Sequence, residues 1–152
     1  MSLIRWMPRR QAAVFHAVTT HAELVGAFAQ MYPGVWDALH EQGPPELGEV
    51  LAVYHSISDD ELVLSAGMEV VGEFAPGEPL SPLELGGCEA GMIDHFGPYL
   101  FDDFRRTQVK LEAALADLGR YPSGMVIERY LTMPDAEPDQ SKWHTEIWLP
   151  LA

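Results

Sequence analysis

The sequence predicts an α+β domain made of two β-α-β-β repeats, at about residues 11–72 and 83–151. Runs of alternating apolar and polar residues indicate the strands, and apolar residues spaced three or four apart indicate one long helix in each half. Two such units most simply form an antiparallel sheet with two long helices packed on it. The halves share this order but no evident sequence identity. A chain of 152 residues fits a single domain, residues 1–152, with enough apolar side chains to bury a core.

The first repeat begins with a strand and a helix. Gln11 to Val18 is apolar and contains β-branched residues, which predicts a buried strand. Thr19 or Thr20 is suited to cap the helix that follows. Pro33 predicts a break near Met31 and a restart, because proline lacks the backbone donor that a helix interior needs. The apolar stripe, which we assign to the protein core, is Leu24, Phe28, Tyr32, Trp36 and Leu39. The turn Gly43-Pro44-Pro45 is expected to end the helix.

Two strands complete the first repeat as a predicted hairpin. They are Glu49 to Ile57 and Leu62 to Val71, joined by the turn-forming residues Ser58-Asp59-Asp60. Gly72 to Pro82 contains several prolines and glycines, so we expect it to connect the two repeats without regular structure.

The second repeat follows the same order. Leu83 to Phe96 predicts a strand that is irregular at Gly86-Gly87. A helix follows Pro98, with acidic residues in its first turn that suit the helix dipole and with Gly119 as its stop. Its buried stripe is Leu100, Phe104, Leu111, Leu115 and Leu118. The last two predicted strands are Met125 to Leu131 and Thr145 to Leu149.

These last two strands carry carboxylates and aromatic rings at alternate positions. Side chains alternate across a strand, so Glu128 and Tyr130 share one face, and Glu146 and Trp148 share one face of the next strand. If the strands pair so that these faces coincide, two carboxylates, a phenol and an indole gather on one patch. A half-buried carboxylate needs a partner, and a cation carried by a ligand is a natural one.

Four short motifs follow one another along the chain. They are Gly43-Pro44-Pro45 with Val53-Tyr54-His55, then Gly67-Met68-Glu69-Val70, then His95-Phe96-Gly97-Pro98-Tyr99, and last G-x-x-x-E-x-Y-L-x-x-P from Gly124 with T-E-I-W-L-P from Thr145. In this order, over about residues 11–151, they resemble the GyrI-like small-molecule-binding domains, the effector-binding domains of AraC-type and MerR-type multidrug regulators.

The resemblance implies the same α+β fold, with pseudo-symmetric halves and a ligand groove between them. It places Glu146 at the acidic residue on the floor of the family's pocket, with Trp148 beside it. It also makes Tyr54 the aromatic wall contributed by the first half, where contact with a cation would suit it. The other ligand-binding residues that it implies are Glu128, Tyr130, His95, Phe96 and Tyr99.

Ordinary structural roles stand beside these assignments. A glutamate such as Glu146 on an alternating strand is usually exposed to solvent, and Trp148 also suits a packed core. The E-x-Y pair could instead hold down the connection of residues 132–144. The turn Gly97-Pro98-Tyr99 could be simply the start of the helix, and Tyr54 could pack in the core with its hydroxyl at the surface. Ser65 stands where family members commonly carry a further acidic residue, which leaves the preference for cations open.

Charge and composition exclude several classes of protein. With 23 acidic and 9 basic residues, the formal net charge is −14, so we expect no direct binding to nucleic acid or to an anionic membrane. Met1 to Arg10 is a small basic approach to the first strand. The single cysteine, Cys88, and the absence of a membrane-length apolar run predict a cytoplasmic protein. The histidines lack metal-ligand spacing and no nucleotide-binding motif is present, so we expect no metal and no cofactor.

Three functions fit these observations. The first is a stand-alone domain, with no room for a DNA-binding domain, that takes an amphipathic, cationic or aromatic molecule into an acidic aromatic groove. The second, implied by stand-alone relatives, is a hydrolase of cyclopropane-bearing or similar electrophilic genotoxins, with Glu146 or Glu128 as general acid/base and Tyr130 assisting. The third is a gyrase-inhibitor-like interaction protein that engages a gyrase or a regulator. A homodimer is compatible with each.

Overall fold

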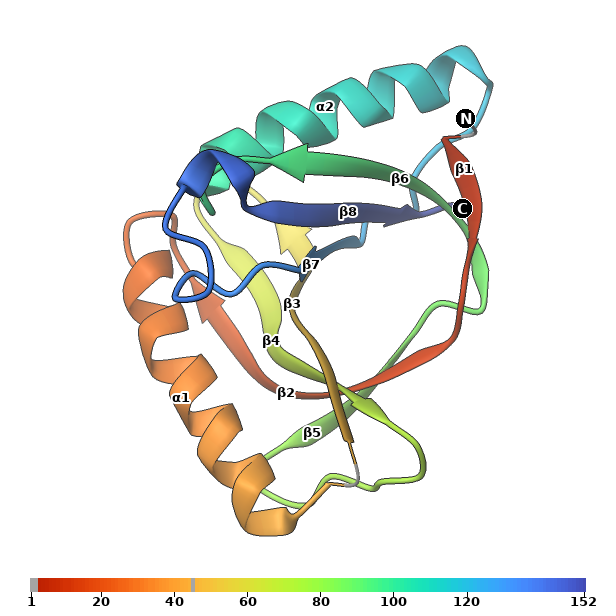
Figure 1. The fold of residues 1–152 in the computed structure, drawn as a ribbon. Coiled ribbons are helices and arrows are strands. Elements are labelled where there is room, and N and C mark those ends of the chain that lie inside the picture. The colour runs from red at the N-terminus through yellow and green to blue at the C-terminus, as the bar shows by residue number, and fades with distance from the viewer. Residues whose placement is uncertain (1–2, 45) are drawn as a thin grey trace.

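A computed structural model describes residues 3–44 and 46–152. In this part of the chain two helices pack on the outer side of a curled, antiparallel sheet of eight strands, which confirms the α+β fold (Figure 1). In chain order the elements are β1 (Ile4–Met7), β2 (Arg10–Thr19), α1 (Leu24–Gln42), β3 (Glu46–Ile57), β4 (Leu62–Val71), β5 (Ser81–Leu85), β6 (Cys88–Phe96), α2 (Phe101–Asp117), β7 (Val126–Tyr130), a short 3-10 helix (Gln140–Lys142) and β8 (His144–Pro150).

The sheet is pseudo-symmetric about its central pair of strands. Its order is β1-β6-β8-β7-β3-β4-β2-β5, so β3 and β7 lie side by side in the middle. From this pair outward, β4 and β2 belong to the first repeat, and β8 and β6 hold the equivalent places in the second. The predicted order of strand, helix, strand, strand is therefore confirmed in both halves.

Each repeat has one more strand than the sequence predicts, and that strand joins the opposite half. β1 pairs with β6, and β5 pairs with β2. The segment Met1 to Arg10, expected as the approach to the first strand, contains the strand β1; Met1 and Ser2 lie outside the described residues. The single strand predicted over Leu83 to Phe96 is two strands, divided at Gly86-Gly87, where the sequence predicts an irregularity. The predicted connection to Pro82 also ends early, because β5 begins at Ser81.

A glycine pair joins β5 to β6 and lies against the segment that follows β1. Gly86 and Gly87 adopt left-handed φ angles of 85° and 70°, which side chains rarely tolerate. A Cβ atom on Gly86 would lie 2.1 Å from the carbonyl oxygen of Pro8. The amide of Gly87 donates to the carbonyl oxygen of Met7 at 2.8 Å. The glycine pair therefore separates β5 from β6 and lets this segment pass close to Met7 and Pro8.

Helix α1 runs without interruption through Pro33. The predicted break near Met31 is wrong, because proline removes one intrahelical hydrogen bond while packing of the helix on the sheet supplies most of its stability. Val35 and Leu39, which follow the proline, are fully buried against the sheet. The periodic stripe thus outweighs the local preference of a single residue.

The ends of α1 follow the sequence more closely. The Glu23 amide donates to Thr20 Oγ1 at 3.3 Å, so Thr20 caps the turn that leads into the helix rather than the helix itself. Gly43 ends it with a left-handed φ of 70°, and its amide donates to the carbonyl oxygen of Leu39 at 2.9 Å. Pro45, predicted as part of this stop, lies outside the described residues.

Alternate residues of each strand face two different cores. The helix-side core, between the helices and the sheet, includes Tyr54, Leu64, Phe104, Leu111, Leu115, Ile147 and Leu149. The inner core, inside the curl, contains Met7, Ala12, Val14, Leu51, Val53, Leu85, Ala90, Met92, Ile127 and Trp148. Neither helix, among the residues described, is long and apolar enough to cross a membrane.

Candidate ligand-binding site

A cavity of about 640 Å³ lies between α1, the start of α2 and the helix-side face of the sheet. This volume is within the range of about 300–1,000 Å³ that is typical of small-molecule sites. Its wall is mainly apolar and aromatic, with rings contributed by both helices and by the two central strands. The aromatic lining residues are Phe28, Tyr32, Trp36, Tyr54, Tyr99, Phe101, Phe104 and Tyr130.

Glu128 is the buried carboxylate of this cavity. It lies opposite Ala52 of β3 and Ile147 of β8, so it faces the helices, and its side chain is fully buried. The Tyr130 hydroxyl donates to Glu128 Oε1 at 2.6 Å, and Arg105 of α2 forms an ion pair with Oε2. Burial raises the pKa of the Glu128 carboxyl, while Arg105 and the hydrogen bond from Tyr130 oppose that rise.

Arg105 lies against two aromatic rings as well as pairing with Glu128. Its guanidinium lies 5.1 Å from the ring centre of Tyr54 and 4.9 Å from that of Phe101. Its Nη1 also donates to Gln108 Oε1. Arg105 is absent from the ligand-binding set predicted from the sequence. Its spacing four residues after Phe101 was the available signal, because residues i and i+4 share a helix face.

The tyrosines that line the cavity contribute uncharged polar groups to its wall. The Tyr32 hydroxyl donates to the carbonyl oxygen of Leu51 at 2.9 Å, and burial raises its pKa well above the usual value. The Tyr99 hydroxyl donates to the Thr132 carbonyl at 2.6 Å, which fixes residues 132–134 along the cavity wall. Tyr32 and Trp36, expected in the helix core rather than in a pocket wall, both line the cavity, and Tyr32 also packs against the helix-side core.

The register of β7 and β8 places the two predicted glutamates on opposite faces of the sheet. Directly opposite residues share a face, and here Glu146 is opposite Arg129, while Trp148 is opposite Ile127. The pairing that would gather Glu128, Tyr130, Glu146 and Trp148 on one patch therefore does not occur. A one-residue offset in strand pairing exchanges the faces completely.

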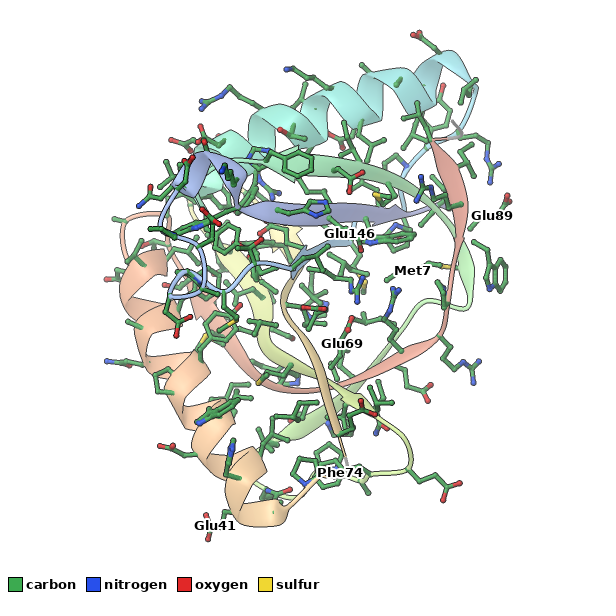
Figure 2. The ribbon with its side chains drawn as sticks, viewed as in Figure 1. Met7, Glu41, Glu69, Phe74, Glu89 and Glu146 are labelled. Carbon is green, nitrogen blue, oxygen red and sulfur yellow. The ribbon has the colours of Figure 1, made fainter. Side chains whose placement is uncertain are left out.

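Glu146 instead belongs to an inner charge cluster inside the curl, and Trp148 lies beside it. Arg129 donates from Nε and Nη2 to Glu69, at 2.6 and 2.9 Å, and from Nη1 to Glu146 at 2.5 Å. The Trp148 indole donates to Glu146 Oε1 at 3.0 Å, and the Arg10 guanidinium lies 5.7 Å from its ring centre. Figure 2 shows Glu69 and Glu146 directed into the curl, away from the helices. We define the inner charge cluster as Arg10, Glu69, Arg129 and Glu146.

The H-x-G-P-Y segment divides between three environments. His95 lies under α2, where its Nδ1 is 2.7 Å from Thr107 Oγ1, and it does not line the cavity. Phe96 is 63% exposed and stacks on His144 with ring centres 4.5 Å apart. Tyr99 alone of these three reaches the cavity. Of the predicted set, the cavity thus brings together Tyr54, Tyr99, Glu128 and Tyr130.

Ser65 faces the curl rather than the cavity. Its Oγ lies 2.6 Å from His16 Nδ1 and 2.7 Å from His55 Nε2, and the side chain is fully buried. This position is therefore part of a hydrogen-bonded group on the inner face. Across the described residues, no group of three or more His, Cys, Asp or Glu side chains is placed to hold a metal ion.

The curled sheet, the two outer helices and the aromatic cavity with its buried carboxylate define a small-molecule-binding α+β domain. The family model of the GyrI-like small molecule binding domain matches residues 2–152. The chain belongs to this family. No curated protein matches the sequence significantly.

Solved structures with low sequence identity share the fold. The EcmrR C-terminal domain is 18% identical with a TM-score of 0.80, and the match covers 98% of this chain and 95% of that one. SAV2435 bound to tetraphenylphosphonium is 13% identical with a TM-score of 0.67, over 98% and 92% of the two chains. A hydrolase from Listeria innocua is 11% identical with a TM-score of 0.62, over 98% and 90%.

Proposed function

We propose that the domain binds an amphipathic aromatic small molecule, cationic or neutral, in the cavity between α1 and α2. The observation that carries this proposal is the apolar wall, rich in aromatic rings, of a cavity of about 640 Å³ whose fully buried carboxylate is Glu128. Membership of a small-molecule-binding family supports it. The tetraphenylphosphonium bound to SAV2435 is a large aromatic cation, which is the kind of molecule that such a wall suits.

The chemistry of the wall favours flat or ring-rich ligands. Aromatic side chains stack on other rings and attract cations through their faces, and they present a large apolar area for burial. The Tyr130 hydroxyl and Glu128 supply the few polar groups that orient a ligand in such a site. Val25 and Trp36, which line the cavity, are 80% and 48% exposed, so ligands enter on their side.

Calorimetric titration tests this proposal with tetraphenylphosphonium and a panel of neutral aromatic compounds. We expect saturable binding at one site. Val25→Trp places a bulky ring at the exposed lining position and should weaken binding at least about tenfold. Val109→Trp is the matched control, because Val109 is an exposed helix residue, 61% accessible, that does not line the cavity. Failure of every compound to bind, or equal weakening by both substitutions, would refute the proposal.

A hydrolase is the second candidate, and the pairing of Glu128 with Tyr130 is the observation that favours it. A carboxyl with a raised pKa beside a phenol in an apolar cavity suits general acid–base chemistry. The test is hydrolysis of a cyclopropane-bearing electrophile. Glu128→Gln should lower the rate by about 100-fold or more, whereas Glu146→Gln, altered on the other face, should leave it nearly unchanged. Equal rates in all three proteins would exclude this candidate.

A further inference from the structure

We propose that Arg105 sets the charge preference of the cavity: its guanidinium cancels the charge of Glu128, so neutral and cationic aromatic ligands bind with similar affinity. This inference rests on the proposed function and adds the specificity-determining residue. Arg105 already supplies the positive charge that a ligand's cation would otherwise bring to Glu128. It pairs with the buried carboxylate and packs against two aromatic rings, Tyr54 and Phe101.

The position of Arg105 is fixed by several contacts. Its Nη2 donates to Glu128 Oε2 and its Nη1 donates to Gln108 Oε1. The two side chains of the ion pair are only 17% and 0% exposed, so solvent screens their attraction weakly. The rings of Tyr54 on β3 and Phe101 at the start of α2 also lie against the guanidinium. Glu128 therefore lines the cavity with its counter-charge fixed beside it, although Arg105 itself is not a lining residue.

The other groups that face Glu128 carry no charge. They are the phenols of Tyr32 on α1, Tyr54 on β3 and Tyr130 on β7, and burial raises the pKa of each. Asp37 also lines the cavity, but it is exposed, so water screens it. Within the described part of the chain, Arg105 is the cation whose charge acts on Glu128. The floor is therefore electrically neutral as a unit.

Removing either partner should make the cavity selective, in opposite directions. Without Arg105 the carboxylate is left with no counter-charge, and in a low-dielectric site that favours a ligand cation strongly. Without the carboxylate, the guanidinium would repel a ligand cation and leave neutral ligands unaffected. A residue that merely held the fold together would change affinity for both kinds of ligand alike.

Two isosteric probes measure this preference: N-methylquinolinium and 1-methylnaphthalene have the same size and shape and differ by one charge. In the wild type at pH 8, calorimetry should give dissociation constants within about threefold of each other. Arg105→Met should shift the ratio toward the cation by about tenfold or more, and Glu128→Gln should shift it toward the neutral probe by a similar factor. Arg106→Met is the matched control, since Arg106 is the neighbouring residue and pairs with Asp103 instead.

Proton release gives a second readout. In Arg105→Met the unpaired, buried Glu128 should take up a proton in the empty cavity and lose it when the cation binds. The binding enthalpy of N-methylquinolinium should then depend on the ionisation enthalpy of the buffer in this variant, but not in the wild type. Because the two substitutions act in opposite directions, either variant alone tests the inference if the other fails to fold.

The outcomes separate this inference from the proposed function. Binding of both probes with a ratio that neither Arg105→Met nor Glu128→Gln changes would overturn the role of Arg105 and leave the cavity proposal standing. A wild type that prefers the cation by about tenfold or more would also overturn it. Failure of the wild type to bind either probe would overturn the proposed function, and this inference with it.

Discussion

At the residue scale, glutamates on the two faces of the sheet are matched by arginines in the same way. Glu128 pairs with Arg105 on the helix side, and Glu146 pairs with Arg129 inside the curl. Each pair also has an arginine against aromatic rings nearby. Glu128 of the first pair lines the cavity between the helices, and Glu146 and Arg129 do not line it. The chemistry of a carboxylate beside a ring therefore does not identify a ligand site until the face on which it lies is known.

Arg129 should be the most important single charge for stability. It donates to both Glu69 and Glu146, and the three side chains are 12%, 8% and 18% exposed. Arg129→Met would leave two carboxylates without their shared partner, and breaking a buried pair in this way typically costs about 3–5 kcal/mol. Urea unfolding should show a loss of that order in the free energy of unfolding.

Arg120→Met is the comparison for that prediction. Arg120 pairs with Glu89 at 3.1 Å, but these side chains are 35% and 55% exposed. Exposed pairs typically contribute about 0–1 kcal/mol, because water and salt screen them. Equal losses for the two substitutions would mean that burial does not distinguish the inner charge cluster from a surface pair.

His95 should make stability depend on pH below its usual pKa of 6.5. Burial lowers the pKa of His95, and its Nε2 is buried without a hydrogen-bond partner, so the folded state resists a second proton. Above pH 6.5 the side chain is neutral in both states. As the pH falls below 6.5, the unfolded chain takes up a proton first, so the free energy of unfolding decreases.

Thermal or urea unfolding between pH 7 and pH 5 measures this effect. His95→Gln should lose less stability over that interval than the wild type does. His21→Gln, altered at an exposed position, should follow the wild-type profile. A profile for His95→Gln as steep as that of the wild type would assign the pH dependence to other groups, such as His55, whose pKa burial also lowers.

At the scale of single elements, β4 depends on a glycine within its extended backbone. A Cβ atom on Gly67 would lie 2.0 Å from the carbonyl oxygen of Ala13 in the neighbouring strand β2. Gly67→Ala should therefore push the two strands apart and lower the free energy of unfolding by about 3 kcal/mol. This close approach also explains why a glycine opens the motif that ends with Val70.

Gly26→Ala is the matched substitution in α1. No atom lies within 4 Å of the Cβ position on Gly26, and alanine is the better helix former. This variant should gain about 0.5–1 kcal/mol of stability in the same urea experiment. A gain at both glycines, or a loss at both, would show that the separation of β2 and β4 does not decide the outcome.

The sequence predicts the pairing of a strand best when the residues that fix it lie close by in the chain. The hairpin strand Leu62–Val71 has the predicted bounds, because a short turn fixes its pairing. The strands β7 and β8 are separated by a long connection, so no turn fixes their register. Their existence was predictable, but the offset that sends Glu128 to the cavity and Glu146 to the curl was not.

At the scale of the whole molecule, the two repeats are interlocked by their leading strands. β1 of the first repeat extends the ladder of β6, and β5 of the second extends that of β2 (Figure 1). These pairings join segments about eighty residues apart, as in Met7 opposite Cys88. Patterns read within short windows do not contain such partners, so the sequence predicts a sheet but not its curl.

The net charge of −14 should make the whole molecule more stable when salt is added. Excess like charge repels itself in the compact state, and salt shortens the range of that repulsion from about 30 Å at 0.01 M to about 8 Å at 0.15 M. The inner charge cluster and the pair of Arg105 with Glu128 are buried and are screened much less. We therefore expect the unfolding midpoint to rise by about 2–4 °C between these concentrations of sodium chloride, which corresponds to about 1 kcal/mol.

A variant with fewer surface charges isolates the cause. Asp59→Asn, Asp60→Asn and Glu61→Gln together remove three exposed negative charges from the turn between β3 and β4 without touching the cavity or the curl. The repulsion that salt relieves is then smaller, so the rise in the midpoint should be smaller too. A midpoint that falls with salt in both proteins would mean that attraction between opposite charges outweighs the repulsion of the acidic surface. Exposed ion pairs that salt does screen, such as Arg120 with Glu89, would then account for the fall.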